Sequence, residues 1–302
     1  MNLRQKTLSG FILILAAAFI SGGALACDPT IDDCVEVGKW EFSLGIGAGV
    51  RTNPVEDAKD IPLFLIPEIS YSGERFFVQN LDLGVFLWES DTQQLNLLAT
   101  PGYDDVYFHR WSPNNFFLDS SRMMTSGLVA SEEDLPVIDT GDKELVEPSF
   151  TSPSERDLRD RHMAGLAGLE YNLSIHSLDL QVQYLSDFTG VHHGEEARVS
   201  LANHWVTGRH HLIGSVGAVW QSSEVINYYY GVTSAEADAR GTYTTDAAIS
   251  GLVRLDWNYQ LTQDWDLRLF ASYRQLPDEI SASPLINDNK VITVFIGGVY
   301  HF

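Results

Sequence analysis

The sequence predicts an all-β fold: a single antiparallel transmembrane β-barrel of ten to twelve strands, with twelve favoured, and one long acidic outer loop. Three observations predict it. The N-terminus has the pattern of an export signal, apolar residues recur at every second position, and the last residues keep this alternation up to an aromatic end. Successive side chains of a strand point to opposite faces, so a two-residue period indicates strands. Only 44% of the 302 residues are apolar, which disfavours a bundle of transmembrane helices.

The first 26 residues are typical of a cleaved secretory signal. Arg4 and Lys6 precede an apolar run at 11–20, and Ala24 to Ala26 fits the small-residue cleavage pattern. A membrane anchor is the alternative, but a spanning helix needs about 20 apolar residues. We therefore expect an exported protein.

The two cysteines, Cys27 and Cys34, both follow the expected cleavage site. In an oxidising compartment they would close a short disulfide loop within an N-terminal segment at 27–38. Alternatively, Cys27 would carry a lipid, although Ala24 stands where the lipoprotein pattern usually has leucine. The disulfide is the favoured interpretation.

The barrel is assigned to residues 39–302. In the first segment, from Trp40 to Arg51, six apolar residues alternate with polar residues or glycine. Segments of about ten residues suit tilted transmembrane strands, whereas strands of soluble sheets are usually shorter. Eleven segments show the pattern: 39–51, 61–72, 75–89, 93–103, 161–173, 178–188, 195–206, 210–222, 242–258, 264–276 and 289–302.

An odd count conflicts with bacterial barrels, which usually have an even number of strands. The apolar phase changes near Asn80, so the segment 75–89 is expected to be either a bulged strand or two short ones. Two short strands would give twelve.

A soluble β-sandwich also alternates, with its apolar face turned to a core. Aromatic residues near the segment ends favour the barrel, because membrane barrels have interfacial aromatic girdles. These residues are Trp40, Tyr184, Trp205, Trp257, Trp265 and Tyr300.

The chain end at 291–302 is similar to the carboxy-terminal signal that the barrel-insertion machinery reads. Gly297, Tyr300 and Phe302 stand at its glycine and aromatic positions, although Phe295 occupies a usually polar one. We expect this end to be the assembly signal.

Four long connections are expected at the outer side of the membrane: 104–160, 188–195, 223–241 and 277–289. The loop 104–160 holds thirteen acidic residues against five lysines and arginines. A solvated flap is one interpretation. A lid, a plug or a divalent-cation site at the lipopolysaccharide surface is the other.

Polar residues on the inward faces of the strands are candidates to line a lumen. They are Arg198, His204, Arg254, Asp256, Arg268 and Arg274. A barrel of ten or twelve strands lies between side-chain-filled and open barrels, so a narrow or plugged pore is expected. We find no catalytic constellation and expect no cofactor.

Other motifs have plain structural interpretations. The pairs at 192–193 and 210–211 are expected at opposite membrane faces, so no shared metal site is predicted. Glu195 and Glu196 are expected at a solvated loop end, and the charged run at 156–161 is expected to form a surface ion-pair cluster of little energetic value. Glycines at 45–49 are expected to give room to neighbouring side chains.

The formal net charge of −22 argues against a nucleic-acid partner, because phosphate binding needs a basic surface. The expected surroundings are instead outer-membrane lipid and lipopolysaccharide of a Gram-negative bacterium.

Several motifs after residue 40 are similar to those of one known family. The stronger ones are Asn227–Val232, Ala235–Glu236, Trp257–Thr262, Trp265, Tyr273, Leu276, Ser283–Pro284 and Tyr300–Phe302, and the weaker ones are Trp40–Gly49, Arg75–Phe77 and Asp187–Gly194. On these residues the chain resembles the MltA-interacting protein (MipA/OmpV) family from residue 40 onward. The stretch 104–155 is longer than the family pattern.

The resemblance implies a non-enzymatic outer-membrane protein. It implies a scaffold that links a lytic transglycosylase to a murein synthase, with a narrow porin-like channel or an adhesin as the alternatives. No catalytic residues come with the family.

Overall fold

The computed structural model describes residues 37–117, 159–236 and 241–302. The expected signal at 1–26, the Cys27 and Cys34 pair and most of the acidic loop lie outside these ranges.

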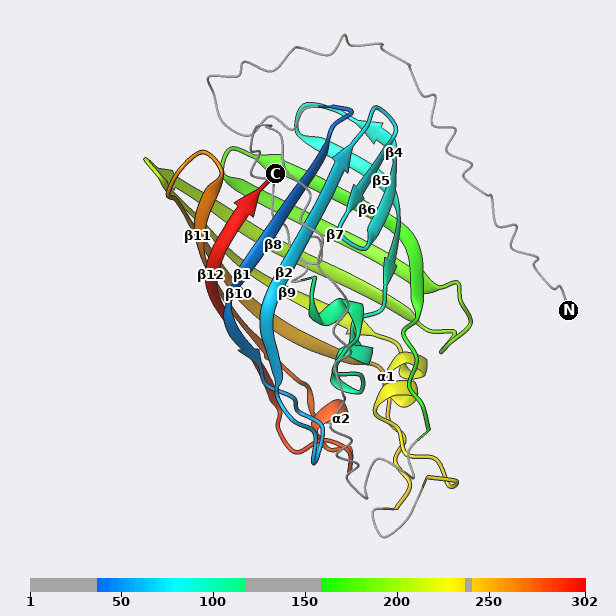
Figure 1. The fold of residues 1–302 in the computed structure, drawn as a ribbon. Helices are drawn as coiled ribbons and strands as arrows, with labels where there is room; N and C mark the ends of the chain where they lie inside the picture. Colours follow the sequence, from blue (N-terminus) through cyan, green and yellow to red (C-terminus); the bar gives the residue numbers. More distant parts are fainter. Residues whose placement is uncertain (1–36, 118–158, 237–240) are drawn as a thin grey trace, which may run out of the picture. The chain divides into compact units, whose positions relative to one another are not determined.

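The described chain is a closed barrel of twelve antiparallel strands, as the sequence predicts (Figure 1). Each strand pairs with its neighbours in sequence, and β1 pairs with β12 to close the wall. The strands are β1 (Trp40–Arg51), β2 (Ile61–Ser72), β3 (Phe76–Gln79), β4 (Asp82–Glu89), β5 (Gln93–Pro101), β6 (Gly165–Ile175), β7 (Leu178–Asp187), β8 (Glu195–Thr207), β9 (His210–Gln221), β10 (Ala248–Gln260), β11 (Trp265–Gln275) and β12 (Lys290–His301). The short helices are η1 (Asp104–Tyr107), η2 (Pro113–Asn115), α1 (Ser223–Tyr229) and α2 (Asp278–Ser281).

The strands are apolar outside and polar inside. In β10, Val253 and Leu255 are exposed, whereas the alternating Arg254 and Asp256 are buried. A soluble sandwich would bury the apolar set in a core. An apolar outer band around a polar interior is the arrangement of a membrane barrel.

The segment 75–89 forms two short strands, which resolves the odd count. The reversal occurs at Asn80, whose backbone has a positive φ of 54°. Its amide donates to the Ile69 carbonyl, and its side-chain oxygen accepts from the Ile69 amide. Asn80 thus takes up the backbone hydrogen bonds of Ile69 on the edge of β2. The pairing of β3 with β2 is therefore limited to residues 70–72 of β2.

The two ends of the barrel differ (Figure 1). The outer end, as we call it, carries α1 and α2, and the chain terminates at the opposite, inner end. At the inner end the strands join through short turns at 73–75, 90–92, 176–177, 208–209 and 261–264. At the outer end, loop residues and strand ends build an apolar cluster that includes Val106, Tyr107, Ile226, Tyr229 and Leu285. The chain therefore has a second, loop-built core in addition to its barrel wall.

Candidate functional site

The barrel interior holds a network of buried charged side chains from several strands. Arg268 of β11 bonds Asp256 of β10 and also contacts Glu68 of β2 across the interior. Arg254 donates to Asp256 at 2.6 Å and lies over the Phe270 ring. The Arg268–Glu68 contact links wall strands that are not neighbours, whereas the bonds to Asp256 lie within β10 or join β10 to β11.

A second part of the network lies on β6 to β9. Glu170 accepts hydrogen bonds from Gln181 and Gln183 of β7. Arg198 of β8 pairs with Glu196 at 2.7 Å. Glu196 was expected at a solvated loop end, and this was wrong, because its side chain turns inward and is buried against Arg198.

The outer mouth of the lumen is filled by η1 and η2, which follow β5. Asp104 of η1 binds Arg274 at 3.0 Å and accepts from Gln221 at 2.5 Å. At η2, the Asn115 side chain accepts from Arg51 at 2.7 Å. The solvated-flap interpretation is wrong for this part of the 104–160 loop, because η1 is completely buried. The buried residues of η1 and η2 pack against inward-facing side chains of the wall instead, and we call residues 104–115 the plug.

A cavity of about 100 Å³ remains below the plug. Four arginines from four strands line it: Arg51, Arg198, Arg254 and Arg274. Glu196 is the one acidic residue among the described lining residues, and the remaining walls include Tyr103, Tyr107, Phe270 and Thr293. This cavity is the strongest candidate for a ligand site.

The six candidate lumen residues differ in their placement. Arg198, Arg254 and Arg274 line the cavity, whereas Asp256 and Arg268 are buried beside it. His204 lies toward the inner end, where it pairs with Asp179 at 2.6 Å. Arg51, which the sequence reasoning placed only on a polar face, belongs to the same cavity.

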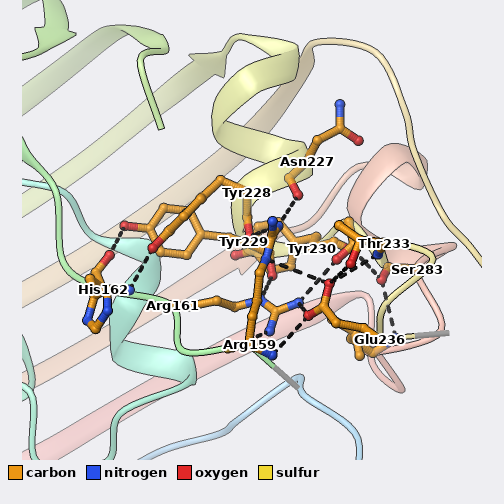
Figure 2. Close-up of polar contacts among 12 residues, drawn as sticks. Arg159, Arg161, His162, Asn227, Tyr228, Tyr229, Tyr230, Thr233, Glu236 and Ser283 are labelled. Atoms are coloured by element: carbon orange, nitrogen blue, oxygen red, sulfur yellow. Dashed lines mark hydrogen bonds and ion pairs between the residues drawn. The ribbon is translucent and has the colours of Figure 1, made fainter. Parts of the chain in front are cut away.

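Outside the barrel wall, Arg161 organises the outer loops (Figure 2). Its guanidinium donates to the Tyr229 and Gly231 carbonyls at 2.6 and 3.1 Å, and it pairs with Glu236 at 3.2 Å. Arg159 donates to the Asn227 and Tyr228 carbonyls. The two arginines fix the C-terminal end of α1 and the turn after it.

Burial alone would raise the pKa of Glu236, but hydrogen bonds from Thr233 and the Arg159 amide and the charge of Arg161 lower it below its usual range. The carboxylate is therefore ionised at neutral pH. The surface-cluster interpretation of 156–161 was wrong for Arg161, because its side chain is 1% exposed and binds backbone carbonyls about 70 residues away.

The histidine pairs lie at the two ends of β8, as their spacing predicts. His192 is buried in the outer loop 188–194, and burial lowers the pKa of its imidazole. His210 starts β9 at the inner end and contacts Trp257 and Tyr259. Within the described ranges, no group of three or more histidine, cysteine or acidic residues is placed to hold a metal ion.

The chain end seals the wall. Gly297 faces Gly47 of β1, and a Cβ at Gly297 would lie 2.6 Å from the Ile46 carbonyl. Tyr300 contacts Trp265, and Phe302 packs edge-on against Tyr300. The glycines of β1 thus give room to the neighbouring backbone as well as to side chains.

The family model described as MltA-interacting protein MipA matches residues 44–302. The chain belongs to the MipA family. It is 26% identical to the Escherichia coli K12 MltA-interacting protein, over 87% of this chain and 90% of that protein. It is 24% identical to the Vibrio cholerae outer membrane protein OmpV, over 96% of this chain and 98% of that protein. It is also 24% identical to the Escherichia coli K12 putative outer membrane protein YiaT, over 87% of this chain and 91% of that protein. Its place is the outer membrane.

Several of the residues that carry the MipA-family resemblance lie at the outer end. The 227–232 stretch supplies the carbonyls that Arg161 binds, and Glu236 supplies its counter-ion. Ser283 donates to the Tyr230 carbonyl at 2.6 Å. Asp187 accepts hydrogen bonds from four backbone amides of the 188–194 loop. In this chain these motifs hold the outer loops on the barrel.

Proposed function

We propose that this chain is a non-enzymatic outer-membrane scaffold that binds a lytic transglycosylase at its inner end. The observation that carries the proposal is membership of the MipA family, together with the name of the Escherichia coli relative, MltA-interacting protein. A murein synthase is the second partner we propose.

The inner end offers the contact surface for an enzyme that acts on peptidoglycan. A barrel inserted with its carboxyl end at the periplasm presents its short turns there. Leu261 is 46% exposed in the turn between β10 and β11, and Arg209 is exposed in the turn between β8 and β9. An apolar and a cationic side chain on rigid turns can serve as anchor points for a partner.

The test is a binding measurement on the full chain in neutral detergent, with a soluble lytic transglycosylase as the partner. The inner-end variant combines Leu261→Asp with Arg209→Glu. The matched control is Trp111→Asp, because Trp111 is 71% exposed on the plug side of the barrel. We expect the inner-end variant to bind at least about tenfold more weakly.

Unchanged binding by the inner-end variant, or loss of binding only in the control, would contradict the inner-end surface. Absence of binding by the wild-type chain would overturn the scaffold. Addition of a murein synthase to the complex tests the second partner, and failure to form a ternary assembly would remove it.

A narrow solute channel is the second candidate. The cavity with its four arginines favours it, because rings of basic side chains select anions in pores. The plug contacts from Asp104 and Asn115 oppose it, because they close the outer mouth. Conductance decides between an open and a closed lumen.

A further inference from the structure

The cavity below the plug has an excess of cationic donors. Arg198 pairs with Glu196, Arg254 with Asp256, and Arg274 with Asp104. Arg51 is 3% exposed, and its partners among the described residues are the neutral side chains of Asn115 and Thr293, at 2.7 and 3.4 Å. Among the described residues, acidic side chains neutralise three of the four arginines, and none neutralises Arg51.

A buried guanidinium without a counter-ion is unfavourable, because hydrogen bonds to neutral groups do not replace the lost hydration of a cation. The Nε of Arg51 donates to Thr293 and its Nη1 to Asn115, which leaves Nη2 without an acceptor among the described residues, and Arg51 lines the cavity. Nη2 is therefore placed to meet an acceptor that the described protein does not supply.

Arg274 adds a second buried donor. Its Nη1 binds Asp104, but its Nε has no hydrogen-bond partner among the described residues, and the side chain is buried. Both Arg51 and Arg274 lie over the Tyr103 ring, at 5.4 and 5.6 Å from its centroid. The ring therefore places the two guanidinium groups around one side of the cavity.

We propose that this cavity binds one small anion with carboxylate-type or phosphate-type oxygens. Arg51 supplies the charge that the anion neutralises, and Arg274 supplies a further donor. Hydrogen bonds from guanidinium groups to such anionic oxygens are charge-assisted and strong, which suits a site with several arginines. The cavity has room for an ion of the size of phosphate or acetate. This site is independent of the scaffold proposed above, which lies at the inner end.

The test is calorimetric titration of the full chain in neutral detergent at low ionic strength, with sodium phosphate in one arm and sodium acetate in the other. Two variants remove the site. Arg51→Gln deletes the unpaired cation, and Thr293→Asp places a carboxylate beside Arg51 inside the cavity. Arg209→Gln is the matched control, because Arg209 is an exposed turn arginine.

We expect saturable binding of at least one probe to the wild type and to the control. Both site variants should bind at least about tenfold more weakly. Heat-modifiable mobility on gels verifies that each variant is folded. Should Arg51→Gln not fold, Thr293→Asp still tests the site, because it removes no arginine. The site is refuted if neither probe binds the wild type, or if a folded site variant binds as the wild type does.

Discussion

At the scale of single residues, Arg161 shows how one buried cation can hold loops together. Its guanidinium satisfies the carbonyl of the last residue of α1 and a second carbonyl in the turn after it, and Glu236 balances its charge. Loops usually keep their polar groups in water, because buried unpaired carbonyls are costly. Arg161 therefore permits the outer loops to pack as a core.

Replacement of Arg161 by methionine should destabilise the protein by about 3 kcal/mol, because Glu236 and two carbonyls would lose a buried partner. The control is Arg159→Met, since the Arg159 side chain is 35% exposed; its cost should be about 1 kcal/mol or less. Urea unfolding in detergent micelles measures both. Equal losses for the two variants would contradict the assigned role of Arg161.

His192 makes the outer end sensitive to pH. Burial lowers the pKa of its imidazole despite the nearby Asp187, and its Nδ1 accepts a hydrogen bond from the Gly194 amide at 2.9 Å. A folded-state pKa below the unfolded value means that the unfolded chain binds more protons. The stabilisation by neutral His192 is therefore complete above about pH 6.5 and decreases as the pH falls below it.

We expect the melting temperature of the wild type to decrease when the pH is lowered from 8 to 5. The decrease should be larger than that of His192→Gln. The exposed neighbour provides the control, His193→Asn, which should keep the wild-type pH profile. Thermal unfolding followed by circular dichroism at several pH values gives the comparison. Parallel profiles for wild type and His192→Gln would refute the assignment.

The residue scale is also where the sequence was least informative. Two-residue alternation predicted that Arg198, Arg254 and Arg274 share a face of their strands, because that rule is local. Apart from the Arg159 carbonyl, which Arg161 also binds, the hydrogen-bond partners of the Arg161 and Arg51 side chains are 64 to 242 positions away, and no local pattern indicates them. A charged run such as 156–161 has the same composition whether it is solvated or buried.

At the scale of elements, the two-residue period predicted most of the wall. Ten of the twelve strands lie within segments found by alternation, or differ from them by a few residues at the ends. The pair β3 and β4 was left open, because a change of apolar phase marks a bulge as well as a turn. The contacts between Asn80 and Ile69 decide for the turn.

Barrel closure depends on the close approach of β1 and β12. A Cβ at Gly47 would lie 2.2 Å from the Ile296 carbonyl and 2.5 Å from the Gly297 Cα. Closure cannot be avoided in a membrane, because unpaired strand edges in hydrocarbon are costly.

Gly47→Ala should therefore destabilise the folded barrel by about 1–3 kcal/mol. Gly251→Ala in β10 is the matched control, since a Cβ there has no neighbour within 4 Å. The fraction of heat-modifiable protein after refolding at graded urea concentrations reports the difference. Equal refolding of the two variants would contradict the close approach of β1 and β12 at Gly47.

At the scale of the whole molecule, the outer end is built to stay closed. The wall forms a complete cylinder, the charged network spans its interior, and η1 and η2 occupy its outer mouth. The plug is held by long-range contacts: Asp104 with Arg274 and Gln221, and Asn115 with Arg51. A closed lumen suits a protein whose proposed role is to hold enzymes rather than to pass solutes.

The most direct test of this closed barrel is conductance in planar bilayers. The full wild-type chain should insert without stable open-pore steps. The double variant Asp104→Ala with Asn115→Ala should show steps, because it removes the plug contacts to Arg274 and Arg51. Stable open steps from the wild type, equal in size to those of the double variant, would contradict the account.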